Sequence, residues 1–488
     1  MWASAISPPY EAAALPTKSI PGGYGLPLLG PLKDRLDYFW FQGPETFFRS
    51  RVAKHKSTVF RTNMPPTFPF FVGVDPRVVA VLDCSSFSVL FDRSLVDKRN
   101  VLVGDYMPSL SFTGGTRVLV YLDPSEPAHA RVKSFCLDLL KRSAATWVSS
   151  FHSNFDVMFD TMEREIAKGG SASGLVPLQQ CIFAFLCRSI VGADPSASPE
   201  IGAKGFAKLD TWLALQVMPT TSVPNFPQPL QEILLHSIPY PSFFISGVYR
   251  KLYEFVEKHG EEVVLRAKIE YGIDKKDAIN NILFVLGFNA FGGFSIFLPT
   301  LLTTVGTDKT GLRERLREEV RRVMQGRPGE ARPGFEAVRE MELVRAQTVY
   351  ETLRLNPPVP LQYGRARIDF TLQSHEAAFQ VRKGELLCGY QPLVMRDPVV
   401  FEDPESFSPE RFIGAAGKEM LKYLFWSNGP QTGTPTADNK QCAAKDYVVE
   451  TACLLLANIF LRYDEFVCAD DGFTVTKLEK AAAAVPIE

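Results

Sequence analysis

Cys442 is the residue whose type and setting point most directly to chemistry in this sequence of 488 residues. It follows a turn-rich stretch that begins Ser427-Asn-Gly-Pro430 and precedes an apolar run over residues 447–461 that predicts a helix. The amide N–H groups and the dipole at a helix N-terminus stabilise a thiolate. Such a thiolate could be the single protein ligand of a haem iron, with the other face of the iron open. Taken alone, the pattern favours an ordinary buried cysteine.

His129 and Lys133 form a second candidate group. They are four residues apart in a helix predicted to begin after Pro127, so their side chains share one face. Two cationic or proton-donating groups on one face could bind a buried anion. A solvated basic helix face is an equally good interpretation of the same spacing.

Asn289 lies in the apolar stretch 277–298, which predicts a buried helix. Gly292 and Gly293 follow on the same face, and small residues let a flat cofactor or a substrate approach the backbone. A buried asparagine needs hydrogen-bond partners. Asn289 therefore either belongs to a structural network or faces a bound polar group.

Glu351 and Arg354 are three residues apart near the end of a helix predicted over 334–355, so they can pair on one face. Arg411, in the motif Pro409-Glu-Arg-Phe412, could complete a buried cluster with them. An isolated Glu-x-x-Arg motif is common on solvated helices and proves little by itself.

Helices dominate the elements that must position these residues. The pattern predicts helices over 43–56 and 76–82, and a hairpin of strands over 57–63 and 69–74. No linker divides the chain, so we expect a flexible segment over residues 1–19 and one domain over residues 20–488. The loop 106–115 is apolar enough to line a pocket.

The charges exclude one class of partner. Lys and Arg number 53 against 54 Asp and Glu, a net charge of −1, and the two signs are interspersed, so we expect no nucleic-acid partner. The eight cysteines form no Cys-x-x-Cys pair and are expected to be reduced.

Any membrane contact is expected to be peripheral. Residues 1–19 contain no apolar run long enough for an anchor. Residues 238–245 are apolar and proline-broken, so they could touch a membrane or a lipid substrate. A loop packed on the core is the slightly better interpretation of that segment.

The order of these motifs resembles that of the cytochrome P-450 superfamily over most of the chain. Glu-x-x-Arg comes first, then Pro-Glu-Arg-Phe, then Phe425-Trp-Ser-Asn-Gly429, and then the cysteine that opens a helix. The resemblance implies a mainly α fold with small β-sheets that binds haem b, iron protoporphyrin IX. It implies Cys442 as the axial iron ligand, and Glu351, Arg354 and Arg411 as the residues that lock the scaffold beneath the haem.

Two departures argue against oxygen activation. A polar insertion over residues 431–438 separates Gly429 from Cys442, and Lys440 stands two residues before the cysteine. Residues 282–294 contain neither the carboxylate nor the hydroxyl with which monooxygenases deliver protons to dioxygen. We therefore expect neither dioxygen nor a redox partner in the reaction.

The departures are similar to those of one plant branch of that superfamily, the fatty-acid hydroperoxide enzymes. Shared motifs include Ile20-Pro-Gly-Gly-Tyr-Gly25, Phe288-Asn-Ala-Phe-Gly-Gly293 and Asn439-Lys-Gln-Cys442. By this resemblance Asn289 lies close to the hydroperoxide, and the haem propionates are held by Lys98, His129, Lys133 and Lys440. The branch is largely plastid-associated, possibly at the envelope, with the cytoplasm as the alternative.

The choice within the branch depends on a substrate pocket expected to contain Leu102, Asn289, Gly292, Gly293 and Ser295. Allene oxide synthases typically have phenylalanine at the position of Leu102 and lysine at that of Ser295. The segments 37–44 and 280–288 look like those of hydroperoxide lyases, whereas 111–115 and 123–127 look more like those of synthases. An ordinary wall residue is the alternative role of Leu102.

The resemblance thus implies a hydroperoxide lyase that cleaves 13-hydroperoxides of linoleic and linolenic acids, through a hemiacetal, into a short-chain aldehyde and an ω-oxo acid. Allene oxide synthase (hydroperoxide dehydratase) and divinyl ether synthase are the alternatives within the branch. A haem-thiolate protein that binds oxylipins without turning them over, and an ordinary monooxygenase, are the alternatives outside it.

Overall fold

The computed structural model describes residues 15–67, 69–71, 73–223, 225–470 and 472–481. The described chain is mainly helical with three small β-sheets, which confirms the fold class expected from the sequence. The α-helices are α1 (Leu29–Leu36), α2 (Pro44–His55), α3 (Cys84–Phe87), α4 (Pro127–Gly169), α5 (Leu175–Leu186), α6 (Gly205–Val217), α7 (Gln228–Leu234), α8 (Ser246–His259), α9 (Glu261–Tyr271), α10 (Lys275–Phe284), α11 (Gly292–Gly306), α12 (Leu312–Gln325), α13 (Phe335–Glu340), α14 (Tyr350–Leu355), α15 (Gln391–Val394), α16 (Gly414–Met420) and α17 (Lys445–Arg462).

Shorter helical turns of two kinds join or interrupt these helices. The π-helical segments are η1 (Asp37–Phe41), η5 (Cys187–Val191), η10 (Val285–Phe291) and η11 (Leu343–Val349). The 3₁₀ turns are η2 (Ser88–Phe91), η3 (Leu110–Thr113), η4 (Leu119–Tyr121), η6 (Pro195–Ala197), η7 (Gly202–Lys204), η8 (Met218–Thr220), η9 (Ser242–Phe244) and η12 (Leu421–Tyr423).

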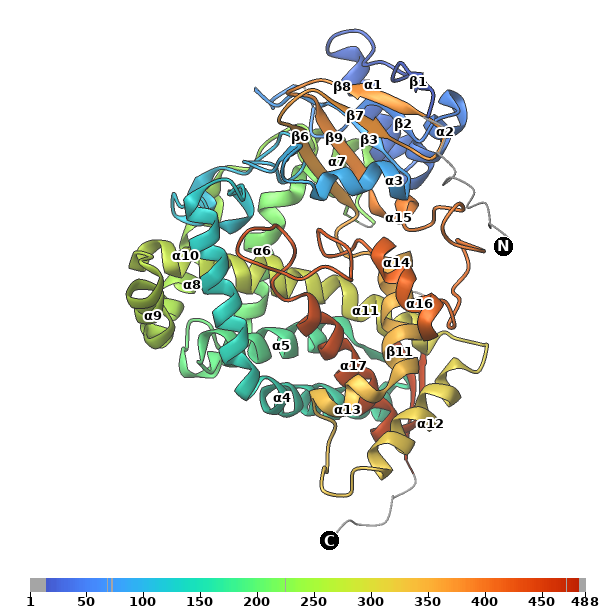
Figure 1. Ribbon diagram of the computed structural model, residues 1–488. Helices are drawn as coiled ribbons and strands as arrows, with labels where there is room; N and C mark the ends of the chain where they lie inside the picture. The colour runs from blue at the N-terminus through green and yellow to red at the C-terminus, as the bar shows by residue number, and fades with distance from the viewer. Residues whose placement is uncertain (1–14, 68, 72, 224, 471, 482–488) are drawn as a thin grey trace, which may run out of the picture.

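Three sheets account for the described strands. The strands are β1 (Thr17–Lys18), β2 (Val59–Asn63), β3 (Arg77–Val81), β4 (Val96–Asp97), β5 (Ala172–Ser173), β6 (Leu361–Ala366), β7 (Phe370–Gln373), β8 (Ala378–Val381), β9 (Leu386–Tyr390), β10 (Tyr463–Cys468) and β11 (Thr474–Lys480). Their orders are β2-β3-β9-β6-β4, β1-β8-β7 and β10-β11-β5. Figure 1 shows the first two sheets, with α1 and α2, at one end of the molecule and the long helices at the other.

The predicted hairpin is only half right. β2 forms as expected, but its antiparallel partner is β3, with Val59 opposite Val81, rather than residues 69–74. The prediction of a helix over residues 76–82 is therefore wrong. The β-branched run of β3 is buried between β2 and β9, and such side chains pack well on a pleated sheet.

The predicted N-terminal segment is only partly described. Residues 1–14 lie outside the described chain, and Thr17–Lys18 pairs with β8 in parallel rather than hanging free. The expected single domain over 20–488 stays a prediction.

The helical end is built around two long helical runs. One is α4, and the other is the continuous run α10–η10–α11, which packs against α5, α6, α14 and α17. The second run, Lys275–Gly306, is long and apolar enough to span a membrane, but more than half of its most apolar window is buried inside the fold. A buried hydrogen bond of 2.9 Å from Trp147 Nε1 to Thr451 Oγ1 joins α4 to α17.

Candidate active site

Cys442 lies in a tight turn before α17, which begins at Lys445, two residues earlier than predicted. The backbone N–H of Cys442 donates to the carbonyl of Ser427 at 2.9 Å, and the N–H of Lys445 donates back to the carbonyl of Cys442 at 3.1 Å. Cys442 is partly exposed, whereas the other seven cysteines are buried. Among the cysteines, it is therefore the one placed to bind a ligand.

The surroundings of Cys442 act on its thiol in two directions. Burial raises the pKa of Cys442, while the Lys133 ammonium and the backbone N–H of Ala444 lower it. A bound iron would displace the proton, because metals bind the thiolate. The amide of Ala444, directly before α17, provides the kind of stabilisation that the sequence predicted for this end of the helix.

Cationic side chains surround the loop that carries Cys442. Lys133 donates to the carbonyl of Gln441, His129 Nδ1 lies 3.0 Å from the carbonyl of Ala437, and Lys98 Nζ lies 3.4 Å from Asn428 Oδ1. Lys440 also lies here, and its ammonium donates to the backbone carbonyls of Leu119, Val120 and Leu122. The structure thus brings together all four residues expected to bind the propionates.

These cations lack enough nearby anions. Burial lowers the pKa of Lys98 and of Lys440 to about 7, and lowers that of His129 to about 4. His129 Nε2 is buried without a hydrogen-bond partner in the described chain. Asp123 is the nearest buried carboxylate, and its pKa falls to about 2 because hydrogen bonds from Ser125, the Lys98 backbone and Arg367 outweigh its burial.

A dianionic cofactor fits this surplus of positive charge. Buried charges need partners of opposite sign, and the two carboxylates of haem would supply them. A cavity of about 210 Å³ lies between Lys98, Lys440 and the turn at Asn428 and Gly429. The partly exposed Cys442 would hold the iron, so the residues present fit both the iron and the carboxylates of haem.

The predicted Glu/Arg cluster is assembled in the interior. Glu351 Oε1 accepts from Arg354 Nη2 at 2.7 Å and from Arg411 Nε at 3.2 Å, and the Glu351 and Arg354 side chains are fully buried. Arg354 also donates to the carbonyls of Met395, Pro404 and Ser406. The cluster ties the end of α14 to the segment before α16 and touches no other candidate residue, which suits a structural role.

Asn289 differs from expectation because it is not buried. It lies in η10, its side chain is exposed, and it has no hydrogen-bond partner within the described chain. The structural-network interpretation of Asn289 therefore has no support. A free amide group on an otherwise apolar helical run is available to a bound polar group.

The two glycines that follow Asn289 have different surroundings. A Cβ on Gly292 would lie 2.7 Å from Leu213 of α6, so this glycine allows helix packing, whereas a Cβ on Gly293 would meet nothing within 4 Å. Only Gly293 leaves open space of the kind predicted for both. Ser295 Oγ is buried without a partner in the described chain, and Leu102 is partly buried in the loop after β4.

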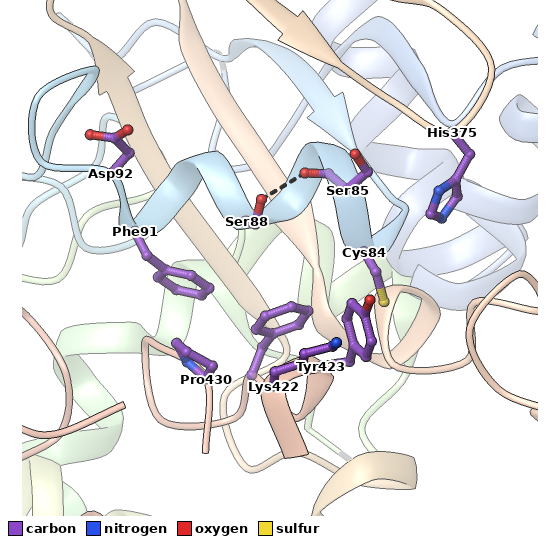
Figure 2. A pocket seen from close by; sticks show the side chains of 10 residues that line it. Cys84, Ser85, Ser88, Phe91, Asp92, His375, Lys422, Tyr423 and Pro430 are labelled. Carbon is purple, nitrogen blue, oxygen red and sulfur yellow. Dashed lines mark hydrogen bonds between the residues drawn. The ribbon is translucent and has the colours of Figure 1, made fainter. Parts of the chain in front are cut away.

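Sequence reasoning missed the residues that shape the cysteine loop. Gln441 donates from Nε2 to Ser427 Oγ at 3.1 Å and to the carbonyl of Pro430, and Asn428 has a positive φ of 57°. Asparagine tolerates that backbone conformation better than most residues, which was a usable signal. A larger open cavity of about 710 Å³, lined by Cys84, His375 and Phe425 among others (Figure 2), contains none of the predicted site residues.

The comparisons agree with this geometry. The family model "Cytochrome P450" matches residues 308–432. "Linolenate hydroperoxide lyase, chloroplastic" of Arabidopsis thaliana is 57% identical over 95% of this chain and 94% of its own length. "Allene oxide synthase 1, chloroplastic" of Solanum lycopersicum is 42% identical over 95% of this chain and 85% of its own length. "Probable inactive linolenate hydroperoxide lyase" of Arabidopsis thaliana is 56% identical over 78% of this chain and 97% of its own length.

The mainly α fold and the cysteine loop suited to haem define a haem-thiolate protein. The chain belongs to the cytochrome P450 family. Within that family it belongs to the branch that contains the hydroperoxide lyases and allene oxide synthases. The resemblance seen in the sequence is thereby confirmed, as is haem as the cofactor of the family.

Proposed function

We propose that this protein is a fatty-acid hydroperoxide lyase that cleaves 13-hydroperoxides of linoleic and linolenic acids. The observation that carries the proposal is the difference in similarity, 57% to a named lyase against 42% to a named synthase, each over 95% of the chain. Leu102 and Ser295, where synthases typically have phenylalanine and lysine, agree with it. The products are a short-chain aldehyde and an ω-oxo acid.

The proposed reaction needs no external oxidant or reductant. The hydroperoxide isomerises to a hemiacetal, which breaks down into the two carbonyl products, so dioxygen and a redox partner are not required. Haem, when bound, supplies an iron that splits the O–O bond of the hydroperoxide. Cys442 holds that iron, and the Asn289 amide binds and orients the hydroperoxide group. Lys98, His129 and Lys133 pair with the carboxylates of the cofactor, and Lys440, whose three N–H groups already reach backbone carbonyls, contributes its positive charge nearby.

Product analysis tests the proposal directly. Purified protein is incubated with paired 9- and 13-hydroperoxides, and the products are separated by mass spectrometry. Aldehyde and ω-oxo acid from the 13-hydroperoxide support the lyase. Ketol and cyclopentenone products alone would instead indicate an allene oxide synthase. A conjugated-diene absorbance that stays constant would indicate a protein that only binds, and activity that needs an electron donor would indicate a monooxygenase.

Leu102→Phe is expected to move the product ratio toward allene oxide. An aromatic face can stabilise a cationic or radical carbon, whereas leucine offers only apolar bulk. The measurement is the ratio of ketol to aldehyde formed from a 13-hydroperoxide, with Leu102→Met as a control that keeps the bulk without the ring. A ratio equal to that of wild type would show that Leu102 is an ordinary wall residue.

The proposed site of action is the plastid, in agreement with the relatives named chloroplastic. We further propose peripheral contact with a lipid bilayer. Phe243 and Phe244 are 67% and 64% exposed, so the interpretation of residues 238–245 as a loop packed on the core does not hold for them. Further exposed apolar side chains are Ile233 on α7, Leu29 and Phe41 on the neighbouring α1–η1 segment, and Leu28 directly before α1.

The double variant Phe243→Ser/Phe244→Ser is expected to weaken binding to phosphatidylcholine vesicles about tenfold or more, since each aromatic ring contributes apolar area to such binding. Co-sedimentation with the vesicles measures the effect. Val399→Ser removes an exposed apolar side chain from another part of the chain and should leave binding unchanged. Equal binding by the double variant and wild type would exclude this segment as the contact.

A further inference from the structure

Lys440 stands two residues before Cys442, and its side chain ends among three backbone carbonyls that we call the Lys440 socket. Its ammonium group donates at 3.1, 2.9 and 2.9 Å to the carbonyls of Leu119, Val120 and Leu122. Three acceptors match the three N–H groups of an ammonium ion. Charge-assisted hydrogen bonds are about twice as strong as neutral ones. The turn η4 therefore holds the loop that carries Cys442.

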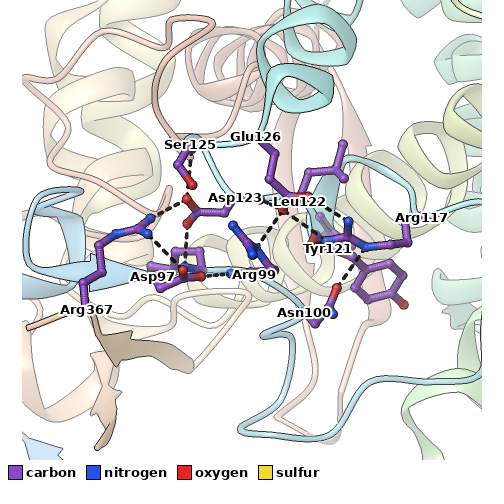
Figure 3. A network of polar contacts seen from close by, with 12 residues as sticks. Asp97, Arg99, Asn100, Arg117, Tyr121, Leu122, Asp123, Ser125, Glu126 and Arg367 are labelled. Carbon is purple, nitrogen blue, oxygen red and sulfur yellow. Dashed lines mark hydrogen bonds and ion pairs between the residues drawn. The ribbon is translucent and has the colours of Figure 1, made fainter. Parts of the chain in front are cut away.

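The turn is braced on its outer side so that these carbonyls stay in place. The carbonyl of Tyr121 faces the other way and accepts from Arg117 Nη2 at 2.9 Å and from the backbone N–H of Asn100 at 3.0 Å. Figure 3 shows the Arg117 guanidinium pointing toward Tyr121 and Glu126, and Arg117 is paired with Glu126 at 2.8 Å. The socket is thus made of a turn whose backbone is fixed independently of Lys440.

Asn281 of α10 braces the same turn on its inner side. Its Oδ1 accepts from the backbone N–H of Leu119 at 3.0 Å, and its Nδ2 donates to the carbonyl of Asp277 at 2.9 Å. The Asn281 side chain is buried, so an unpaired Leu119 N–H would cost free energy there. Asn281 belongs to the helical run that carries Asn289, eight residues further on.

We infer that Asn281 is a positioning residue for the iron-ligand loop. It fixes the turn that receives Lys440, and through Lys440 it sets where Cys442 stands relative to the helical run that carries Asn289. Asn281 is not among the residues proposed to contact substrate or cofactor, because its amide is taken by Leu119 and Asp277. The inference rests on Cys442 as the iron ligand, which belongs to the proposed function, and is independent of which hydroperoxide is the substrate.

Asn281→Leu tests this role in the haem-loaded protein. The variant leaves the Leu119 N–H without its acceptor, and we expect haem transfer to excess apomyoglobin to become about tenfold faster, as for other residues that orient a metal ligand. The Soret band of the ferrous carbon monoxide complex should shift in part from the thiolate position to that of a neutral thiol. Tyr249→Phe, which removes a 2.6 Å hydrogen bond to the neighbouring Asn280, is the matched control and should change neither readout.

Two further variants separate positioning from general stability. Asn281→Asp keeps an acceptor for the Leu119 N–H, so it should restore transfer kinetics close to those of wild type. The double variant Asn281→Leu/Lys440→Met should lose haem no faster than Lys440→Met alone, because both act through one path. Should Asn281→Leu not fold, Asn281→Ser replaces it in the same comparison.

Wild-type transfer rates and an unshifted band in Asn281→Leu would overturn the positioning role, as would additive effects in the double variant. A wild-type protein without the thiolate band would overturn the assignment of Cys442 itself. Because that second failure appears before any variant is measured, the two failures are distinguishable.

Discussion

Asn289→Leu is expected to lower turnover of a 13-hydroperoxide about a hundredfold or more while leaving the haem spectrum intact. Removing one preorganised hydrogen-bond donor from a reaction centre costs roughly 10² to 10³ in rate. The Asn289 amide is exposed and unpartnered in the described chain, so its loss removes no structural contact. Loss of the conjugated-diene absorbance measures turnover, and the Soret band measures haem binding.

The matched control for this prediction is Asn458→Leu on α17. The Asn458 amide donates a hydrogen bond to the carbonyl of Leu454 in its own helix. Asn458→Leu is therefore the same substitution, but it removes no hydrogen-bond donor from η10. Turnover near that of wild type is expected for the control. Loss of haem from Asn289→Leu would contradict the proposed role, because Asn289 would then be structural.

The geometry around Asn289 shows where sequence patterns lose information. The apolar run correctly predicted one long helix, but a pattern with a period near 3.6 residues cannot show the π-helical turn of η10. The turn is associated with Gly287, where a Cβ would lie 2.7 Å from Trp212 of α6. The close approach of α6 is a tertiary contact between distant segments, so the local sequence did not predict it. π-turns are frequent at functional sites.

The Glu351 cluster, in contrast, could be predicted from the sequence. Its three members are of types that pair with one another, and they precede or follow helix-breaking prolines that fix their place in the chain. Their assembly could be predicted because a buried glutamate requires cationic partners. The socket of Lys440 could not be predicted in this way, since backbone carbonyls carry no signal in the amino-acid sequence.

The prediction of a helix where β3 forms failed for a third reason. Residues 76–82 begin with a proline and are mostly apolar, a pattern that suits a short helix as well as a strand. Pairing with both β2 and β9 decides the outcome, and β9 lies some three hundred residues further along the chain. Residues that pair over such a separation override local propensity.

Lys98→Met is expected to act in opposite directions on the two forms of the protein. In the haem-free protein it should raise the free energy of unfolding at neutral pH by an amount on the order of a few kcal/mol, because it removes a buried ammonium without an adequate counter-ion. In the haem-loaded protein it should weaken haem retention, because it removes a partner of a propionate. Urea unfolding and haem transfer to apomyoglobin measure the two effects.

The stability of the haem-free protein should depend on pH in a direction that the pKa of Lys98 determines. Burial holds the pKa of Lys98 at about 7 in the folded chain, below the ordinary value near 10.5 that the unfolded chain retains. The unfolded state therefore binds more protons between these values, so the stability of the haem-free protein should rise as pH increases from about 7 to about 10. Lys98→Met should flatten this rise without abolishing it, since the pKa of Lys440 is lowered in the same way.

Bound haem should remove the same pH dependence in the wild-type protein, because a propionate beside Lys98 keeps the ammonium charged in the folded state. Lys54→Met, an exposed lysine on α2, is the matched control and should alter neither stability nor haem retention. A Lys98→Met protein that is less stable without haem and holds haem as tightly as wild type would show that Lys98 serves the fold alone. The opposite signs expected here follow from one proposal, which is that this cluster of buried cations binds the carboxylates of the cofactor.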